Sequence, residues 1–360
     1  MWITLNFSFR VILYLYNNMV ILGIETSCDE TAISILKDEK IVADIVSSQF
    51  FHQLYGGVVP ELASRAHLKH IVSLFQEAIK KANISKNEID AIAVTYGPGL
   101  IGALLVGLNF AKGLSLGLKK PLIGVNHIEA HLLSVFLDEN KPSLPYLGLI
   151  VSGGHTQLVL VKNVFQYKIL GYTKDDSAGE AFDKVAKMLG LSYPGGPIID
   201  KMGKTGNKKF IKFPEPCKNT NDYSFSFSGL KTSVLYYLRK IKKENPNFNF
   251  LSTPFINDIC ASFQESVVNV LSDKLIKAAK EFNIKNIAVT GGVSANSALR
   301  ENISFKAKEN NLNLFIPGVN LSTDNASMIA LVGKLKYEKQ MFSELNLTAS
   351  PNLKLENYEN

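Results

Sequence analysis

The stretch "VILGIETSCDETAISILKDEKIVADIVSS", residues 20–48, contains three largely apolar runs separated by two short polar turns. The second run alternates apolar and polar residues, and the charged turn KDEK separates it from the third. Runs of this length bounded by turn residues are typical of β-strands joined as hairpins. The sequence therefore predicts a strand, a small polar turn around residues 26–31, and two further strands.

The same pattern returns in the second half of the chain, in "LGLIVSGGHTQLVLVKNVFQYKILG" from Leu147. An ungapped shift of 147 − 22 = 125 residues brings the two stretches into register. Self-similarity over such a distance indicates a duplicated structural unit, so the sequence predicts two related α/β domains. The shift aligns identical residues at Leu22 and Leu147, Gly23 and Gly148, Ser27 and Ser152, Thr31 and Thr156, and Lys37 and Lys162.

Each hairpin is followed by a strand that runs through a glycine turn into a helix. The first such transition is "IDAIAVTYGPG" at 89–99, and the second is "IKNIAVTGGVSANSAL" at 284–299. A helix N-terminus after glycines offers unpaired amides to an anion, although glycine turns also close ordinary β–α connections. The turn around Gly153 and Gly154 has the same two interpretations, an ordinary hairpin or a close approach of the backbone to phosphate.

The segment "HIEAH", residues 127–131, places two histidines four positions apart, on one face of a helix. Asn126 and Glu129 indicate the start of that helix. The zinc-peptidase pattern has its glutamate directly after the first histidine, where this chain has Ile128, so peptidase chemistry is disfavoured. The residues alone fit either a metal site or a structural pair, and a metal site would need a third ligand.

A rival histidine pair, His67 and His70, lies in the amphipathic stretch "ASRAHLKHIVSLFQEAIKKA", where a solvated helix face for both rings is the alternative to a role as ligands. The segment at 175–200 predicts a helix that begins near Ser177 and ends at Gly190. In this segment Asp183 and Asp200 have the acceptor chemistry to bind a ribose diol, with surface charge as the alternative.

Composition is that of a two-domain globular protein, with 360 residues and 46% hydrophobic residues. The net charge of +7 and a pI near 9.0 only weakly favour a polyanionic partner. The three cysteines form no CxxC pair, which favours a reducing compartment and a cytoplasmic location over a disulfide framework. The cysteines are Cys28, Cys217 and Cys260.

The apolar N-terminal segment at 1–18 has neither the length of a membrane span nor the pattern of a signal peptide. Because Met19 directly precedes the first strand, we expect translation to start there and the segment to be a dispensable extension. The predicted organisation is a first lobe at 19–140, a second lobe at 141–345 with a helical insertion at about 175–260, and a tail at 346–360.

Ten stretches resemble, in order, the tRNA N6-adenosine threonylcarbamoyltransferase family (TsaD/Kae/OSGEP-like, formerly described as O-sialoglycoprotein endopeptidases). This family lies within the actin, Hsp70 and sugar-kinase superfamily. The resemblance implies duplicated actin-like (ASKHA) ATPase-type α/β domains with a nucleotide cleft between two lobes. The stretches are GIETSCDETA, GGVVPELASR, GPGLIGALLVG, NHIEAHLLS, VSGGHTQL, AGEAFDKVAKMLGL, YPGGP, FSFSGLKT, GGVSAN and STDNASMIA.

The resemblance implies transfer of the threonylcarbamoyl group from threonylcarbamoyl-AMP to the N6 amine of adenosine 37 in tRNAs reading codons that begin with A, with release of AMP. It implies metal ligands at His127, His131 and Asp324, although an N-cap is the default explanation of Asp324 from its position alone. No catalytic residue beyond the metal ligands is implied. The implied substrate-binding residues are Ile150, Val151, Ser152, Gly153, Gly154, Asp183, Gly196, Asp200 and Asn296.

One divalent metal ion is expected, with Fe²⁺ favoured and zinc as the alternative. The expected partners are tRNA, threonylcarbamoyl-AMP, a catalytically inactive paralogue and a small ATPase, with no membrane. Two other functions remain open at this point: a sugar-kinase-like or chaperone-like ATPase, supported by the duplication alone, and a metallopeptidase.

Overall fold

The computed structural model describes residues 18–356 except 219, 221 and 247–251, and these fold into two compact units. The predicted extension at 1–18 lies outside the described residues apart from Asn18. The segment Asp324–Leu355 belongs to unit 1, whereas the sequence analysis placed 324–345 in the second lobe. The reason is that this segment returns to pack on the first sheet. Of the described residues, unit 1 comprises 18–50, Val58–Leu137 and Asp324–Leu355; unit 2 comprises Phe51–Gly57, the described part of Asp138–Thr323, and Glu356.

The two units contain the same five-stranded sheet. The strand order is β3-β2-β1-β4-β5 in unit 1 and β10-β9-β6-β7-β8 in unit 2, which is the same order read from the opposite edge. Three strands form antiparallel pairs, and two further strands run parallel to the first. The predicted duplicated α/β fold is thus confirmed. The strands are β1 (Val20–Glu25), β2 (Glu30–Lys37), β3 (Lys40–Ser48), β4 (Ala91–Gly97), β5 (Leu122–Asn126), β6 (Tyr146–Val151), β7 (Thr156–Asn163), β8 (Gln166–Tyr172), β9 (Asn286–Thr290) and β10 (Asn313–Phe315).

Strand register confirms the shift of 125 residues. Leu22 pairs with Ile35 in the first hairpin, and Leu147 pairs with Leu160 in the second. Each residue of the first pair lies 125 positions before its counterpart in the second pair, since 147 − 22 = 125 and 160 − 35 = 125. A slip of one residue would move every side chain to the opposite face of the sheet, so this agreement places equivalent residues on equivalent faces.

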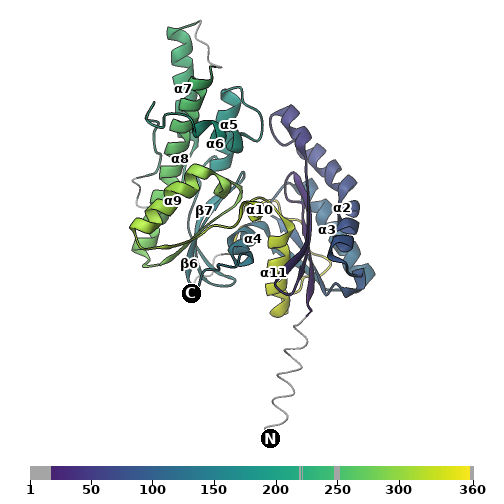
Figure 1. Cartoon of the computed structure of the whole chain (residues 1–360). Helices are drawn as coiled ribbons and strands as arrows, with labels where there is room; N and C mark the ends of the chain where they lie inside the picture. Colours follow the sequence, from purple (N-terminus) through teal and green to yellow (C-terminus); the bar gives the residue numbers. More distant parts are fainter. Residues whose placement is uncertain (1–17, 219, 221, 247–251, 357–360) are drawn as a thin grey trace. The chain divides into compact units, whose positions relative to one another are not determined.

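Helices cover both faces of the sheet in unit 1, with α2 and α3 on one face and α11 on the other (Figure 1). The close approach of α11 depends on Gly23 in β1, where a Cβ would lie 2.3 Å from the carbonyl oxygen of Ala326. A larger residue at this position has no space because the nearest atoms belong to backbone. The helices of unit 1 are α2 (Pro60–Ala82), α3 (Ile101–Leu118), α4 (His127–Leu133) and α11 (Ala326–Glu338), with short 3₁₀ turns at Lys86–Glu88 and Ser134–Leu137.

Helix α3 is long and apolar enough to cross a membrane by length and composition alone. In unit 1 it packs against β4 and α2, and it buries Ala103, Leu104, Leu108 and Ala111 there. An apolar helix that covers a sheet needs the same composition. The packing therefore accounts for the apolar character of α3.

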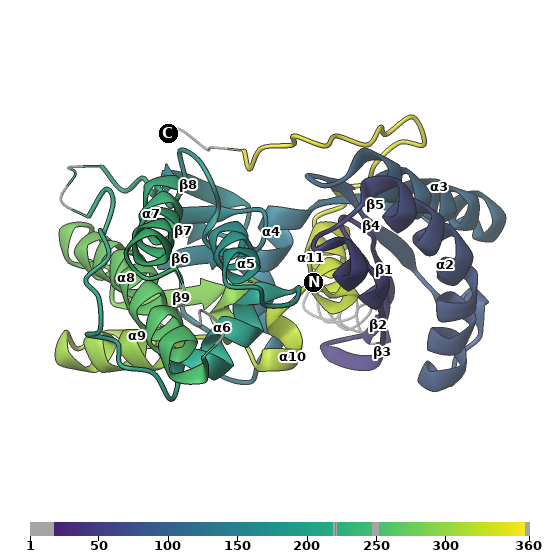
Figure 2. The same cartoon turned by 90° about the horizontal axis from the view of Figure 1, so that it is seen from above.

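The helices of unit 2 share one large core with the odd-numbered side chains of β6. At its centre the rings of Phe182 and Phe263 meet edge to face, with centroids 5.2 Å apart. The long helix α8 contacts β6, β9 and α9, and Figure 2 shows α8 beside α9. The helices of unit 2 are α5 (Ala178–Met188), α6 (Gly195–Gly203), α7 (Ser228–Glu244), α8 (Thr253–Glu281), α9 (Ser297–Glu309) and α10 (Val319–Ser322), with a 3₁₀ turn η4 at Gly292–Ala295; a further 3₁₀ turn, η1, spans Phe50–Tyr55.

Candidate metal centre

Helix α4 begins directly at the end of β5 because Asn126 caps it. The Asn126 Oδ1 accepts the backbone N–H groups of Ile128 and Glu129, at 2.9 and 3.3 Å. The predicted helix start is thus confirmed. One turn of α4 then separates His127 from His131, and their buried rings lie 4.6 Å apart between centroids.

Asp324 lies just before α11 and reaches both histidines. Its Oδ1 is 2.9 Å from the Nε2 of His131 and 3.5 Å from the Nε2 of His127. The N-cap interpretation of Asp324 is wrong, since Asn325 caps α11 by accepting the Met328 N–H at 2.9 Å. Capping by the neighbouring residue leaves the Asp324 carboxylate available to the histidines.

These three residues fit a divalent transition metal by their chemistry and their spacing. One ligand atom from each lies within 4.8 Å of the others. Ligand atoms around a tetrahedral zinc ion at 2.0–2.1 Å stand roughly 3.3 Å apart, close to the measured 2.9 and 3.5 Å. The Nδ1 of His131 is buried with no hydrogen-bond partner among the described residues. The Asp324 side chain is 24% exposed, which leaves one side open to a substrate.

The electrostatic field of the site favours a cation. Burial alone would lower the pKa of His127, but the carboxylates of Asp324 and Glu25 outweigh it and raise this pKa to about 9. Burial, followed by the charges of Asp324 and Asp29, raises the pKa of Glu30 to about 8. Several carboxylates therefore surround the histidines, and a bound cation would relieve their mutual repulsion.

Glu129, the carboxylate within HIEAH, is engaged elsewhere. It forms a largely buried ion pair with Lys336 of α11, with 3.0 Å between Oε2 and Nζ. This pair ties α4 to α11. Because Glu129 faces Lys336 rather than the histidines, it does not take the position of a peptidase general base.

The alternative of a solvated face for both His67 and His70 is wrong for His67. This ring is fully buried; its Nδ1 lies 2.8 Å from the Thr31 hydroxyl, and its Nε2 lies 2.9 Å from the Cys28 carbonyl oxygen. The physical reason is that α2 packs on β2, which turns His67 toward the turn after β1. His67 thus braces that turn, and His70 is half-buried.

Glu25 is a site residue that the sequence analysis missed. It is the last residue of β1, fully buried, and its Oε2 lies 3.1 Å from the Nδ1 of His127. The opposing effect of burial is outweighed by His127, so the pKa of Glu25 is lowered. A carboxylate at the end of an otherwise apolar strand was the available signal, since charged residues are rarely fully buried without a partner.

The remaining candidate residues lie in unit 2, beginning at the end of β6. Ile150 and Val151 are buried strand residues, and Ser152 closes the turn by donating its N–H to the His155 carbonyl at 2.8 Å. Gly153 and Gly154 are exposed at the tip. A Cβ on either glycine would meet nothing within 4 Å, so the space above the turn is open.

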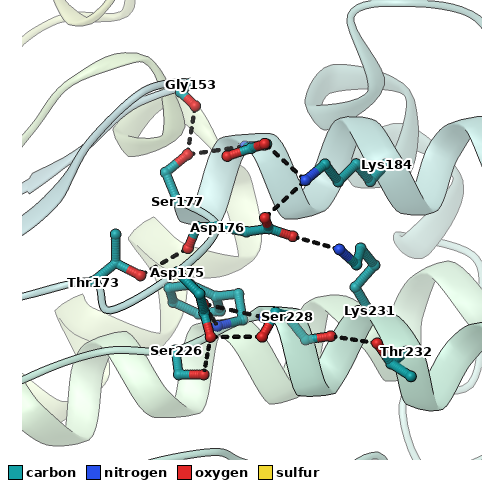
Figure 3. A network of polar contacts seen from close by, with 12 residues as sticks. Gly153, Thr173, Asp175, Asp176, Ser177, Lys184, Ser226, Ser228, Lys231 and Thr232 are labelled. Atoms are coloured by element: carbon teal, nitrogen blue, oxygen red, sulfur yellow. Dashed lines mark hydrogen bonds and ion pairs between the residues drawn. The ribbon is translucent and has the colours of Figure 1, made fainter.

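A polar network holds this turn against α5 and α7 (Figure 3). The Ser177 hydroxyl donates to the Gly153 carbonyl and also caps α5, as predicted for its N-terminus. Asp175 accepts the Phe227 N–H at 2.8 Å, at the start of α7. Asp176 pairs with Lys184 and Lys231 at 2.7 and 2.8 Å. These contacts fix the loop that carries Ser177.

The other predicted binding residues lie on or beside the helices of unit 2 and contact neighbouring helices. Asp183 on α5 accepts the Gly195 N–H at 2.7 Å. Asp200 on α6 accepts the Ser297 hydroxyl at 2.8 Å. Asp183, Asp200 and Asn296 thus connect helices of unit 2 to one another. Their contact with a substrate stays a prediction. Asn296 caps α9 through Leu299 and donates to Gln264 at 2.7 Å, and Gly196 has only the Phe182 Cβ, at 4.0 Å, near its Cβ position.

Known proteins resemble the chain over most of its length. The family model for TsaD, described as tRNA N6-adenosine threonylcarbamoyltransferase, matches residues 40–331. A protein of that name from Thermosipho africanus is 52% identical over 339 residues, which is 94% of this chain and 100% of the relative. Another from Riemerella anatipestifer is 49% identical over 339 residues, covering 93% of this chain and 98% of the relative.

A solved structure shares the fold at low sequence identity. Full-length HypF, in a phosphate- and nucleotide-bound form, has a TM-score of 0.60 and 13% identity to this chain. The likeness covers 90% of this chain and 47% of HypF. It supports the duplicated α/β fold and says nothing of the reaction.

Proposed function

We propose that this chain, which belongs to the TsaD family of tRNA N6-adenosine threonylcarbamoyltransferases, transfers a threonylcarbamoyl group to tRNA. The acceptor is the N6 amine of adenosine 37 in tRNAs reading codons that begin with A. The donor is threonylcarbamoyl-AMP, and AMP is released. The family match over 292 of 360 residues (331 − 40 + 1) is the observation that carries the proposal.

The reaction forms a nitrogen–carbon bond and breaks a carbon–oxygen bond and one N–H bond, and the proton passes to the leaving phosphate or to solvent. The N6 nitrogen attacks the carbamoyl carbon, the bond from this carbon to the phosphate oxygen breaks, and the amine loses a proton. An adenine amine is a poor nucleophile because its lone pair is delocalised into the ring. The protein must therefore position the two substrates and stabilise the charge that develops on the carbonyl and the leaving phosphate.

His127, His131 and Asp324 would hold one divalent metal, which supplies Lewis-acid polarisation of the donor when bound. Two histidines with one carboxylate favour ferrous iron, and zinc is the alternative because no redox step is required. The buried histidines keep water from one side of the site, while the partly exposed Asp324 leaves the other side accessible.

Unit 2 would bind the adenylate part of the donor. The exposed turn at Gly153 and Gly154 has room for a phosphate next to backbone N–H groups. Asp183 accepts the Gly195 N–H and Asp200 accepts the Ser297 hydroxyl, and ionised carboxylates are acceptors of the kind that bind ribose hydroxyls. Gly196, Asn296 and the strand end at Ile150 and Val151 would complete the contacts.

The tRNA, an inactive paralogue and a small ATPase are the proposed partners, in the cytoplasm. Support for a polyanionic partner comes from the net charge of +7 and from the end of α7. There the side chains of Arg239, Lys240, Lys242 and Lys243 are exposed within six residues of the helix end. Exposed cations of this density attract a phosphate backbone without base specificity.

The direct test is to incubate the protein with tRNA and threonylcarbamoyl-AMP, with its partner subunits added. Nucleoside mass spectrometry should show threonylcarbamoyladenosine, and AMP should appear in equal molar amount. The His131→Ala protein is the negative control. Release of AMP that stays the same with and without tRNA, with no modified nucleoside, would contradict the proposal and indicate hydrolysis of the adenylate.

A further inference from the structure

We propose that Glu25 is a positioning residue that selects the Nε2 atom of His127 as the metal ligand. The inference rests on the proposed metal centre and does not depend on the tRNA reaction. Its basis is a set of hydrogen bonds inside unit 1 that fix Glu25 first and the histidine ring second. Metal-bound histidines commonly depend on such a carboxylate behind the ring.

The Glu25 carboxylate has little freedom to move. The side chain is fully buried at the end of β1. Its Oε1 accepts the backbone N–H of Ser27, and its Oε2 accepts the hydroxyl of Thr95 from the neighbouring strand β4. With both oxygens anchored, the carboxylate is fixed before any metal arrives.

The same Oε2 faces the Nδ1 of His127 at 3.1 Å. An ionised carboxylate can only accept hydrogen bonds, so the Nδ1 must carry the proton. The Ser27 hydroxyl lies 3.3 Å from this nitrogen, but a hydroxyl donates or accepts and imposes no choice. The opposite nitrogen, Nε2, points to Asp324 at 3.5 Å and is the atom left to bind a metal.

The second histidine has no such support. The Nδ1 of His131 is buried without a hydrogen-bond partner among the residues that the structure describes, and its Nε2 faces Asp324 at 2.9 Å. The two rings are therefore held differently. His127 is oriented from behind by Glu25, whereas the orientation of His131 relies on Asp324 and on packing.

The neutral isostere Glu25→Gln should reverse this choice. The Ser27 N–H can only donate, so the amide oxygen of glutamine must stay on it. The Thr95 hydroxyl can turn and accept, so the amide NH₂ takes the place of Oε2. That NH₂ then donates to the Nδ1 of His127, which forces the proton onto Nε2 and blocks it as a ligand.

Zinc alone is the probe, titrated into the full chain against a competing chelator. Glu25→Gln should weaken zinc affinity ten- to a hundredfold. The control is Glu61→Gln, an exposed carboxylate of α2 in the same unit that pairs with Arg65; its zinc affinity should stay within about threefold. Thr95→Val, which removes one anchor of Glu25, should weaken affinity by less than Glu25→Gln.

Nitrogen NMR of the six histidines in the zinc-loaded wild type gives a second readout that needs no variant. His127 should show a protonated Nδ1 and a zinc-bound Nε2. Unchanged zinc affinity in Glu25→Gln, or zinc bound at the Nδ1 of His127, would overturn the role of Glu25. A wild type that binds no zinc or ferrous iron would instead overturn the metal centre itself.

Discussion

The turn after β1 and the turn after β6 occupy the same place in the two repeats, yet they carry opposite chemistry. Under the shift of 125 residues, Glu25 corresponds to Ile150 and Asp29 corresponds to Gly154. The first turn places carboxylates next to two histidines. The second exposes the backbone of Gly153 and Gly154, where no other atom lies within 4 Å of either Cβ position. One arrangement favours a cation and the other an anion.

This difference shows that the sheet and the turn residues have separate tasks. Both hairpins keep the same register, so the repeated strands place their turns at equivalent edges. Strand pairing uses the backbone, whereas the charge at each turn depends on a few side chains, such as that of Glu25 in the first repeat. Variants at the turns should therefore change binding in one unit and leave the other unit intact.

The largest effect is expected from His131→Ala, which removes one of three proposed metal ligands. Bound metal, measured by mass spectrometry after equilibration with zinc, should fall to background, and transfer should drop at least about a thousandfold. The control is His70→Ala, a half-buried histidine on α2 that should retain both. Full metal occupancy in the His131→Ala protein would show that the ligand set is wrong.

Asp183→Asn should reduce affinity for threonylcarbamoyl-AMP by roughly ten- to a hundredfold, or about 1.5–3 kcal/mol, because one charged acceptor is lost. The asparagine oxygen can still accept the Gly195 N–H, so the fold should persist. Transfer at saturating donor should recover most of the wild-type rate, measured by rapid quench. A rate that stays depressed thousands-fold at saturation, with donor affinity intact, would indicate a role in the chemical step instead.

The two glycine sites offer a contrast in stability. Gly23→Ala should destabilise unit 1 by about 1–3 kcal/mol, because its Cβ would lie 2.3 Å from backbone of α11. Gly154→Ala is the control and should change stability by less than about 0.5 kcal/mol, since nothing lies near its Cβ. Thermal or urea unfolding measures both. Equal effects would mean that α11 does not pack this closely on β1.

The smallest effect is expected from Asp176→Asn in the network of Figure 3. Burial opposes the shift, but hydrogen bonds and charge from Lys184 and Lys231 outweigh it and lower the pKa of Asp176. A carboxylate with a lowered pKa stabilises the fold above its unfolded pKa, near 3.8, and this contribution is lost as pH falls through the folded value. The variant should lose less than about 1 kcal/mol at pH 7.

The difference in melting temperature between wild type and Asp176→Asn should shrink as the pH is lowered from 7 to below 3.8. Lys240→Met, which removes an exposed cation of α7 that pairs with Glu244 at 3.9 Å, is the control and should leave the melting temperature unchanged. A difference that grows toward acid pH would have the wrong sign and would contradict the lowered pKa.

Local patterns predicted the strands and the helix starts, because these depend on neighbouring residues, and the recurrence of one such pattern predicted the duplication. Asn126 and Ser177 cap their helices as the sequence indicated. Asp324 and Asn325 have equal capping chemistry, so the sequence alone did not show that Asn325 would take that place.

Long-range contacts were beyond sequence reasoning. The partners of Glu25, Thr95 and His127, lie 70 and 102 positions away in the chain, and nothing near Glu25 announces them. The burial of His67 likewise depends on the packing of α2 against β2, and its partner, the Cys28 carbonyl, lies 39 positions away. The return of α11 to unit 1 is a third case, since a helix pattern does not specify which sheet the helix covers.

The central claim is that the cation site belongs to unit 1 and the adenylate site to unit 2. The most direct test measures zinc affinity and threonylcarbamoyl-AMP affinity on the same preparations of wild type, His131→Ala and Asp183→Asn, with the donor titrated in the absence of zinc. The account predicts that His131→Ala loses zinc and keeps its metal-free donor affinity, whereas Asp183→Asn keeps zinc and loses donor affinity ten- to a hundredfold. Loss of both affinities in both folded variants would contradict it.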